Sequence, residues 1–122
     1  MLALGFAWTF TLRHNQPRMP DEKQFHRVAN VSDIPPQAAK TVQIGTHEIA
    51  LFNRAGTFYA LDNRCPHRGA SLAEGFVDGR RVLCPLHLFD FDLLTGKCGA
   101  VGELKVATHD VQVEGDEVFV LI

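Results

Sequence analysis

The sequence predicts an all-β fold, either a sandwich or a partial barrel. Short runs rich in Val, Ile, Phe and Thr recur along the chain, and turns containing Gly, Asp or Pro separate them. No segment shows the sustained 3.6-residue apolar period of an amphipathic helix, and no internal repeat is present. The 122 residues, 46% hydrophobic and 21% charged, suit one domain with a modest core.

The predicted strands follow one another through short turns. Pro35 and Pro36 mark a turn after the first strand, because proline fixes φ and lacks an N–H donor. Gly45-Thr46 suits a hairpin turn, and Asp78-Gly79 is a favoured two-residue hairpin turn. The predicted strands are residues 25–29, 40–44, 47–52 and 57–61, a hairpin over 75–82, and then 89–93, 106–113 and 117–121.

Two short arms carry the most distinctive chemistry of the chain. The first reads Cys65-Pro66-His67, and the second, sixteen residues later, reads Cys84-Pro85-Leu86-His87. Each arm supplies one thiol and one imidazole from a turn-rich loop. A thiolate is soft and an imidazole is borderline, so two of each suit an iron–sulfur cluster or zinc. Zinc fingers pair Cys with Cys and His with His, so the mixed arms favour iron–sulfur.

This pattern resembles the Rieske ferredoxin family, as do both arm prolines and the segment over residues 68–75. The resemblance covers residues 25–122 and implies stacked antiparallel sheets with two cluster-binding loops at one tip. It implies a Rieske-type [2Fe–2S] cluster with two Cys and two His ligands. The inner iron would be held by Cys65 and Cys84, and the outer iron by His67 and His87.

The residues near the arms predict a low reduction potential. In the high-potential Rieske proteins of cytochrome bc complexes, a disulfide joins the loops, and Ser and Tyr hydroxyls donate to the cluster sulfurs. The matching positions in this chain are Ala70 and Leu86 for the disulfide and Phe89 and Phe91 for the hydroxyls. Hydrogen bonds to sulfur raise the potential, so we expect the low end of the Rieske range, about −150 mV. That potential suits an electron from NAD(P)H through a flavin.

Two electron-transfer roles and one binding role are compatible with the motif. Asp92 and Thr95-Gly96 after the second arm, with a proline-free tail, resemble the small subunit of NAD(P)H-dependent nitrite reductase, which is the first prediction. The alternative is the ferredoxin of an aromatic-ring dioxygenase system, although such proteins usually carry a proline beside the cluster and none follows Pro85. The partner is then a flavin or NAD(P)H reductase, or a large catalytic subunit. A zinc-stapled interaction module is the third hypothesis.

Composition excludes some classes of partner and compartment. A formal net charge of −2 gives no nucleic-acid footprint. Three cysteines leave Cys98 as a free thiol, which fits the cytoplasm, and without a secretory signal a Cys65–Cys84 disulfide is disfavoured. The apolar run over residues 1–12 is shorter than the roughly twenty residues of a membrane span and is a poor signal peptide. We expect no membrane association.

The domain is expected to cover residues 21–122. Residues 1–20 would be an N-terminal extension, either disordered or produced by a mis-assigned start; the alternative is an arm that packs on the domain or on a partner. Two arginines, Arg64 and Arg68, flank the first arm and are expected to steer a partner. The remaining histidines have no partner at motif spacing and are expected to lie on the surface or in hairpins: His14, His26, His47 and His109.

Overall fold

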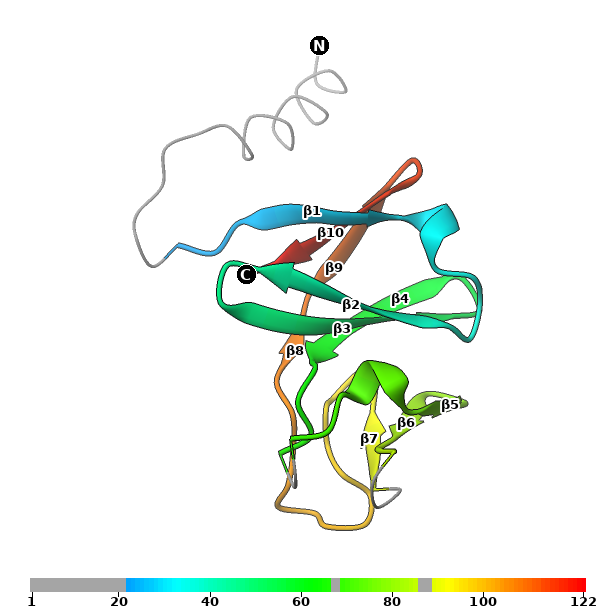
Figure 1. Ribbon diagram of the computed structural model, residues 1–122, viewed down its shortest axis with the longest axis vertical. Coiled ribbons are helices and arrows are strands. Elements are labelled where there is room, and N and C mark those ends of the chain that lie inside the picture. The colour runs from blue at the N-terminus through cyan, green and yellow to red at the C-terminus, as the bar shows by residue number, and fades with distance from the viewer. Residues whose placement is uncertain (1–21, 67–68, 86–88) are drawn as a thin grey trace.

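The computed structural model describes residues 22–66, 69–85 and 89–122. Their strands form three antiparallel sheets, in the orders β1-β10-β9, β2-β3-β4-β8 and β5-β6-β7 (Figure 1). The described residues contain two short 3₁₀ turns, no α-helix and no helix able to span a membrane. The all-β prediction is confirmed. The strands are β1 Phe25–Asn30, β2 Ala39–Ile44, β3 His47–Arg54, β4 Thr57–Asp62, β5 Phe76–Asp78, β6 Arg81–Leu83, β7 Asp90–Asp92, β8 Thr108–His109, β9 Val111–Glu114 and β10 Glu117–Leu121.

Strand β3 is the centre of the molecule because both of its faces are buried. Side chains alternate along a strand, so Ile49 and Leu51 face one way and Ala50 and Phe52 the other. The first two join the core that also contains residues of β1 and β10. The second two join the core formed with residues 63–107. A strand buried on both faces has a continuous apolar run, as residues 49–52 do.

Residues 63–107 form a smaller unit, the cluster unit, inserted between β4 and β8. The chain enters it after Asp62 and returns at β8, which pairs with β4 through Ala60↔His109 and Leu61↔Thr108. The Asp62 N–H also donates to the Ala107 carbonyl at 3.0 Å. The described chain beside both arms lies at the end of the molecule away from β1 and β10 (Figure 1). The predicted placement of both loops at one tip is therefore confirmed.

The prediction of one strand over residues 106–113 is wrong. The segment contains two strands of different sheets, because β8 pairs with β4 whereas β9 pairs with β10. Val106 packs in the core of the cluster unit, and Val111 packs against the core of β1 and β10. The apolar alternation continues across this change of core, so the alternation could not reveal it.

The predicted hairpin over residues 75–82 forms, but its turn is one residue later than expected. Asp78 pairs with Arg81, which leaves Gly79-Arg80 as the two-residue loop. Gly79 has φ +62 and Arg80 does not have a positive φ. A glycine with positive φ at the first loop position is the pattern of a type II′ turn, whose twist matches that of the strands.

Candidate metal centre

Both predicted arms are closed at their base by the same backbone contact. The Cys65 N–H donates to the Ala70 carbonyl at 2.8 Å, and the Cys84 N–H donates to the Phe89 carbonyl at 2.7 Å. In each arm the cysteine therefore bonds to the residue five positions later. The first arm is tightened further by a 2.7 Å bond from the Gly69 N–H to the Cys65 carbonyl. Two loops of equal length thus begin at the two cysteines.

The two cysteines lie in one apolar core. Cys65 is 1% exposed and Cys84 is 0% exposed, and both belong to the core of the cluster unit together with Phe91. No disulfide joins these two described cysteines. Two thiols brought by separate loops into one water-excluding core are a donor set that fits an iron–sulfur cluster. The other predicted ligands, His67 and His87, lie outside the described residues.

Asn63 fixes the start of the first arm from a buried position. Its side-chain Oδ1 accepts from the Ala73 N–H at 2.9 Å and from the Ser71 Oγ at 3.2 Å. Its Nδ2 donates to the Ser71 Oγ at 3.0 Å and to Glu48 Oε2 at 2.6 Å. At 1% exposed, Asn63 needs these partners, since a buried amide without them is costly. The two ends of the arm are therefore held at a fixed separation.

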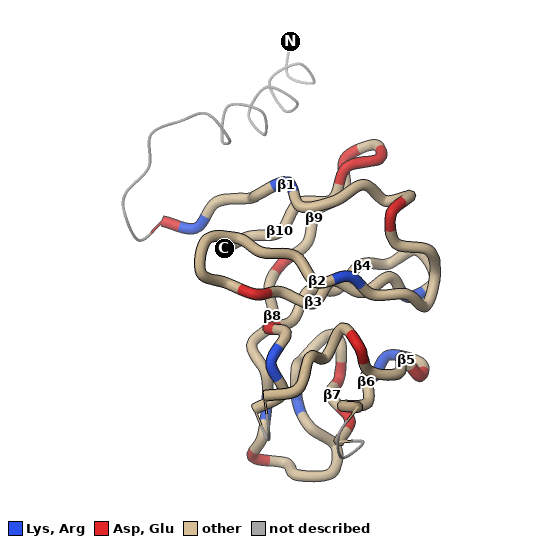
Figure 2. Tube along the Cα trace, in the orientation of Figure 1, with Lys and Arg blue, Asp and Glu red and all other residues tan. Residues whose placement is uncertain are grey.

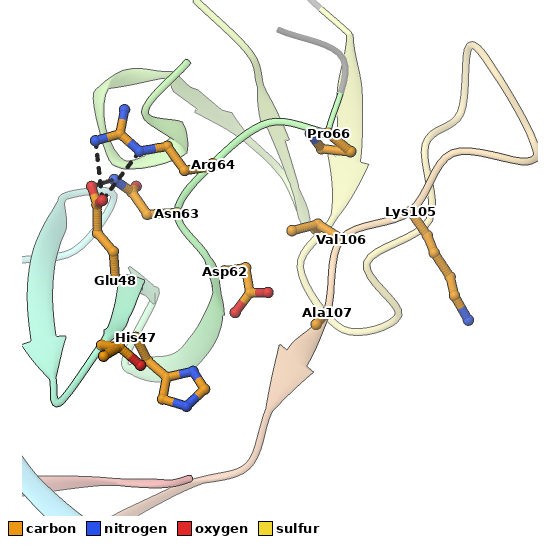
Figure 3. Close-up of a pocket in the computed structure, with 10 residues that line it drawn as sticks. His47, Glu48, Asp62, Asn63, Arg64, Pro66, Lys105, Val106 and Ala107 are labelled. Atoms are coloured by element: carbon orange, nitrogen blue, oxygen red, sulfur yellow. Dashed lines mark hydrogen bonds and ion pairs between the residues drawn. The ribbon is translucent and has the colours of Figure 1, made fainter. Parts of the chain in front are cut away.

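Glu48 connects the first arm to strand β3. Its Oε1 accepts from Arg64 Nε at 3.1 Å (Figure 3). Arg64 Nη1 also donates to the Gly69 carbonyl inside the arm at 3.1 Å. The hydrogen bond from Asn63 lowers the pKa of Glu48, with burial opposing it and Arg64 adding to it. Arg64 is exposed, as predicted, and it also has a structural contact that the sequence did not predict. It braces the loop, and Arg68 lies outside the described residues.

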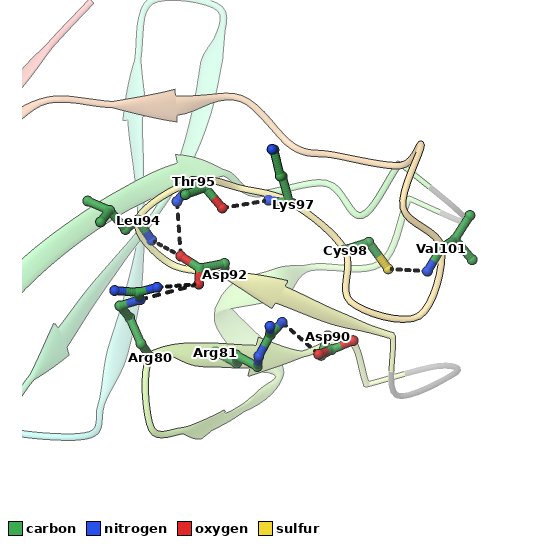
Figure 4. A network of polar contacts seen from close by, with 9 residues as sticks. All are labelled: Arg80, Arg81, Asp90, Asp92, Leu94, Thr95, Lys97, Cys98 and Val101. Carbon is green, nitrogen blue, oxygen red and sulfur yellow. Dashed lines mark hydrogen bonds and ion pairs between the residues drawn. The ribbon is translucent and has the colours of Figure 1, made fainter.

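A second carboxylate holds the chain behind the second arm (Figure 4). Asp92 Oδ1 accepts from the N–H groups of Leu94 and Thr95 at 2.8 and 3.0 Å, and Oδ2 accepts from Arg80 Nη2 at 3.0 Å. Burial alone would raise the pKa of Asp92. The two N–H donors and the Arg80 guanidinium outweigh it, so the pKa is lowered and the carboxylate stays charged.

A third loop, over residues 98–104, lies beside the two arms. Cys98 is 3% exposed in the same core as the other two cysteines, and its Sγ accepts from the Val101 N–H at 3.4 Å. The base of this loop packs closely on an ion pair. A Cβ at Gly99 would lie only 2.6 Å from Asp90 Oδ2. Asp90 in turn bonds Arg81 Nη1 at 2.7 Å. The free thiol predicted for Cys98 thus has a packing role.

A cleft of about 390 Å³ lies behind the first arm (Figure 3). Its wall includes Asp62, which pairs with His109 Nε2 at 2.7 Å across β4 and β8. The sequence did not predict this partner for His109, because Asp62 and His109 are far apart in the chain and form no motif. The lining residues are Thr46, His47, Glu48, Asp62, Asn63, Arg64, Pro66, Lys105, Val106 and Ala107.

Known proteins share this sequence pattern and fold. The ferredoxin component of the naphthalene 1,2-dioxygenase system of Pseudomonas aeruginosa is 37% identical over 101 residues, which are 81% of this chain and 95% of that protein. The ferredoxin subunit of 3-phenylpropionate/cinnamic acid dioxygenase of Shigella flexneri serotype 5b is 41% identical over 93 residues, which are 74% of this chain and 86% of that protein.

Solved structures agree with these relatives. A chain in the complex of reduced oxygenase and oxidised ferredoxin of carbazole 1,9a-dioxygenase is 31% identical with a TM-score of 0.73, covering 79% of this chain and 91% of that one. A Mycobacterium tuberculosis protein assigned as an NADH-dependent nitrite reductase small subunit has a TM-score of 0.78. It is 22% identical, covering 84% of this chain and 97% of that one, so it shows the fold alone.

A model of one family matches residues 24–120, nearly the whole described part of the chain. The family is described as the Rieske [2Fe–2S] domain. Its cofactor is a Rieske-type [2Fe–2S] cluster, and its function is electron transfer. This chain belongs to the Rieske [2Fe–2S] domain family.

Proposed function

We propose that the cluster is held by Cys65, His67, Cys84 and His87. The observation that carries this assignment is the pair of matching loop closures, in which each cysteine begins a six-residue loop of the same length. His67 falls third and His87 fourth within its loop, so each loop supplies one imidazole beyond its buried thiol. Two Cys and two His are the ligand set of a Rieske centre.

In this assignment the chain orients its ligands and excludes water. When bound, the cluster takes up and releases one electron. Asn63 and Arg64 hold the first arm, while Asp92 and Arg80 hold the chain that follows the second arm. The core behind the thiols is apolar, and Phe91 belongs to the same core as Cys84. A phenyl ring donates no hydrogen bond to sulfur, which keeps the potential low.

The partner system is, in this proposal, an oxygenase with a separate reductase. Support comes from the two dioxygenase ferredoxins at 37% and 41% identity, each matched over most of its length. These relatives favour the alternative over our first prediction, the nitrite reductase subunit. One observation still favours the nitrite reductase role. No proline follows Pro85 in the sequence, so the third loop has none, and this loop is fixed through Cys98. We place the protein in the cytoplasm and the domain over residues 21–122.

Reconstitution tests this assignment. The purified protein would replace the ferredoxin component of the naphthalene 1,2-dioxygenase system, with NADH, reductase and oxygenase present. We expect NADH oxidation coupled to an oxygenated product, and no product when the chain is left out. The opposite result would be that the protein delivers electrons to the large subunit of an NAD(P)H-dependent nitrite reductase and does not couple to the oxygenase. That result would assign the protein to nitrite reduction.

A further inference from the structure

Two lysines face each other at the base of the third loop. Lys97 and Lys105 are partners in an isolated antiparallel bridge. The bonds on either side of the pair run from the Val106 N–H to the Gly96 carbonyl at 2.9 Å and from the Cys98 N–H to the Leu104 carbonyl at 3.0 Å. The lysines therefore occupy a non-hydrogen-bonded pair, the kind in which opposite side chains lie closest.

Neither ammonium group is neutralised. Both lysines are exposed, and neither forms an ion pair in the part of the chain that the structure describes. The other described cations of the cluster unit all pair with carboxylates: Arg64 with Glu48, Arg80 with Asp92 and Arg81 with Asp90. Like charges directly opposite each other on paired strands are destabilising. The fold thus places two like charges at opposite positions, where an oppositely charged pair would be more favourable.

The lysine pair lies on a ribbon that packs against the core of the buried cysteines. Along the ribbon, exposed lysines alternate with Cys98 and Val106, which face the core that contains Cys65 and Cys84. Lys105 also lines the cleft together with Pro66 of the first arm. Figure 3 shows its side chain pointing away from the carboxylates of Glu48 and Asp62. The pair therefore lies on the outer surface of the core that holds both predicted cysteine ligands.

Charge is distributed unevenly along the molecule. In the sequence, residues 63–107 carry six basic and five acidic residues, a net +1, whereas residues 22–62 and 108–122 carry four basic and eight acidic residues, a net −4. Figure 2 shows acidic residues at the β9–β10 turn, at the end away from the cluster unit. A protein with this asymmetry turns its cluster unit toward a negative surface as it approaches.

We propose that Lys97 and Lys105 form a docking point for an acidic surface of the redox partner. The inference rests on the proposed electron-carrier role and adds the charge of the partner and the side on which it binds. Charge complementarity of this kind accelerates encounter and fixes orientation, and its effect weakens with salt. Electrons would then cross between the partner and the cluster on the side of the third loop and the first arm.

Protein-film voltammetry on charged monolayers tests the proposal without an identified partner. The probe is a gold electrode coated with a carboxylate-terminated thiol monolayer, compared with an ammonium-terminated one. We expect the wild-type protein to exchange electrons faster on the carboxylate surface. The double variant Lys97→Glu/Lys105→Glu should be slower there by about tenfold or more and should recover on the ammonium surface. Raising the salt concentration should reduce the wild-type advantage.

A matched control separates the site from net charge. The double variant Lys23→Glu/Lys40→Glu carries the same charge change outside the cluster unit and should keep the wild-type rate on the carboxylate surface. The single variant Lys105→Glu creates an opposite-charge pair with Lys97, so it should melt at or above the wild-type temperature while transferring electrons more slowly. This combination cannot arise from a merely structural role.

Two outcomes would overturn the docking point. One is an equal loss in the two double variants, which would show that only net charge matters. The other is an unchanged rate in Lys97→Glu/Lys105→Glu, with or without aggregation, which would mean that the lysines only protect a strand edge. A wild-type film with no Rieske signal would instead contradict the proposed function, so the two failures are distinguishable.

Discussion

Glu48 predicts how firmly the first arm retains its cofactor. The Glu48→Ala variant removes the acceptor shared by Asn63 Nδ2 and the Arg64 guanidinium, so Arg64 no longer braces the Gly69 carbonyl from a fixed position. Groups that orient metal ligands typically change metal affinity by tenfold or more. We expect the variant to lose its cluster about tenfold faster than wild type during incubation with a chelator. Visible absorbance measures this loss. Glu74→Ala is the control, because this exposed carboxylate has the same charge and no ion pair among the described residues.

Asp92 predicts the stability of the segment behind the second arm. The Asp92→Ala variant removes the charged acceptor of the Leu94 and Thr95 N–H groups, and a hydrogen bond to a charged group contributes about 1.5–3 kcal/mol. Because Leu94 and Thr95 are exposed and water can replace part of what is lost, chemical unfolding of the cluster-loaded protein should show a loss of about one such bond rather than two. Asp92→Asn keeps one acceptor oxygen and should lose less. No loss in Asp92→Ala, or an equal loss in the exposed Asp110→Ala control, would contradict this role.

The same carboxylate predicts an acid dependence of stability. The pKa of Asp92 is lowered in the folded protein, so its charged form contributes stability that is fully present above the unfolded value of about 3.9. That contribution is lost as the pH falls through the lower folded pKa. The unfolding free energies of wild type and Asp92→Asn, measured from pH 7 to pH 3, should therefore converge at the acid end. A gap that widens on acidification would show that the charge is not the stabilising element.

Sequence reasoning predicted the four ligands but not the residues that support them. Cys65 and Cys84 are recognisable because a thiol and an imidazole recur at short spacing in both arms. Glu48 lies outside the motif, and its contact with Asn63 exists only because the β2–β3 hairpin passes the first arm. Arg64 carried a signal, its position next to the ligand, but its charge suggested steering rather than bracing.

At the scale of elements, Gly96 predicts whether the third loop can form. Its φ is +78, and a Cβ there would lie 2.1 Å from the Val106 carbonyl oxygen, which is a severe steric clash. A left-handed conformation alone costs a non-glycine residue about 1–2 kcal/mol. We expect Gly96→Ala to give little cluster-loaded protein on expression. The control is Gly102→Ala in the same loop, where a Cβ meets nothing within 4 Å and the variant should load normally.

Most strands were predictable because local signals and tertiary structure agree. The runs around Val42 and Ile49 are joined by the Gly45-Thr46 turn, and the observed hairpin of β2 and β3 has this turn. Strand β8 was not predictable as a separate strand. Its two residues pair with β4, where the partner of Thr108 is Leu61, forty-seven positions earlier, and such distant pairing leaves no local trace.

At the scale of the whole molecule, the described fold is closed without the first twenty-one residues. Strand β1 begins at Phe25, and Gln24 exchanges backbone hydrogen bonds of 2.8 and 3.1 Å with Ile122. We therefore predict that deleting residues 1–18 leaves cluster content and reduction potential unchanged, as measured by visible spectroscopy and redox titration. Loss of cluster-loaded protein on deletion would show that this segment belongs to the core.

The partner was the least predictable property. Both candidate systems use the same four ligands, so the motif cannot separate them, and the proline-free third loop favoured nitrite reductase. The relatives at 37% and 41% identity favour dioxygenase ferredoxins instead. In the proposed docking mode, the partner is recognised by Lys97 and Lys105, whose pairing across the ribbon is visible only in the fold.

The assignment of Cys65, His67, Cys84 and His87 as cluster ligands is tested most directly by analysing the metal centre of the purified protein. Iron and acid-labile sulfide should each be about two per chain, and the reduced protein should give the low average g value of a mixed His and Cys site. The midpoint potential should lie near −150 mV, at about the low end of the Rieske range, because Phe89 and Phe91 supply no hydroxyl. Replacing His67 or His87 with Cys should move the spectrum toward an all-thiolate type. Stoichiometric zinc without sulfide would contradict the assignment.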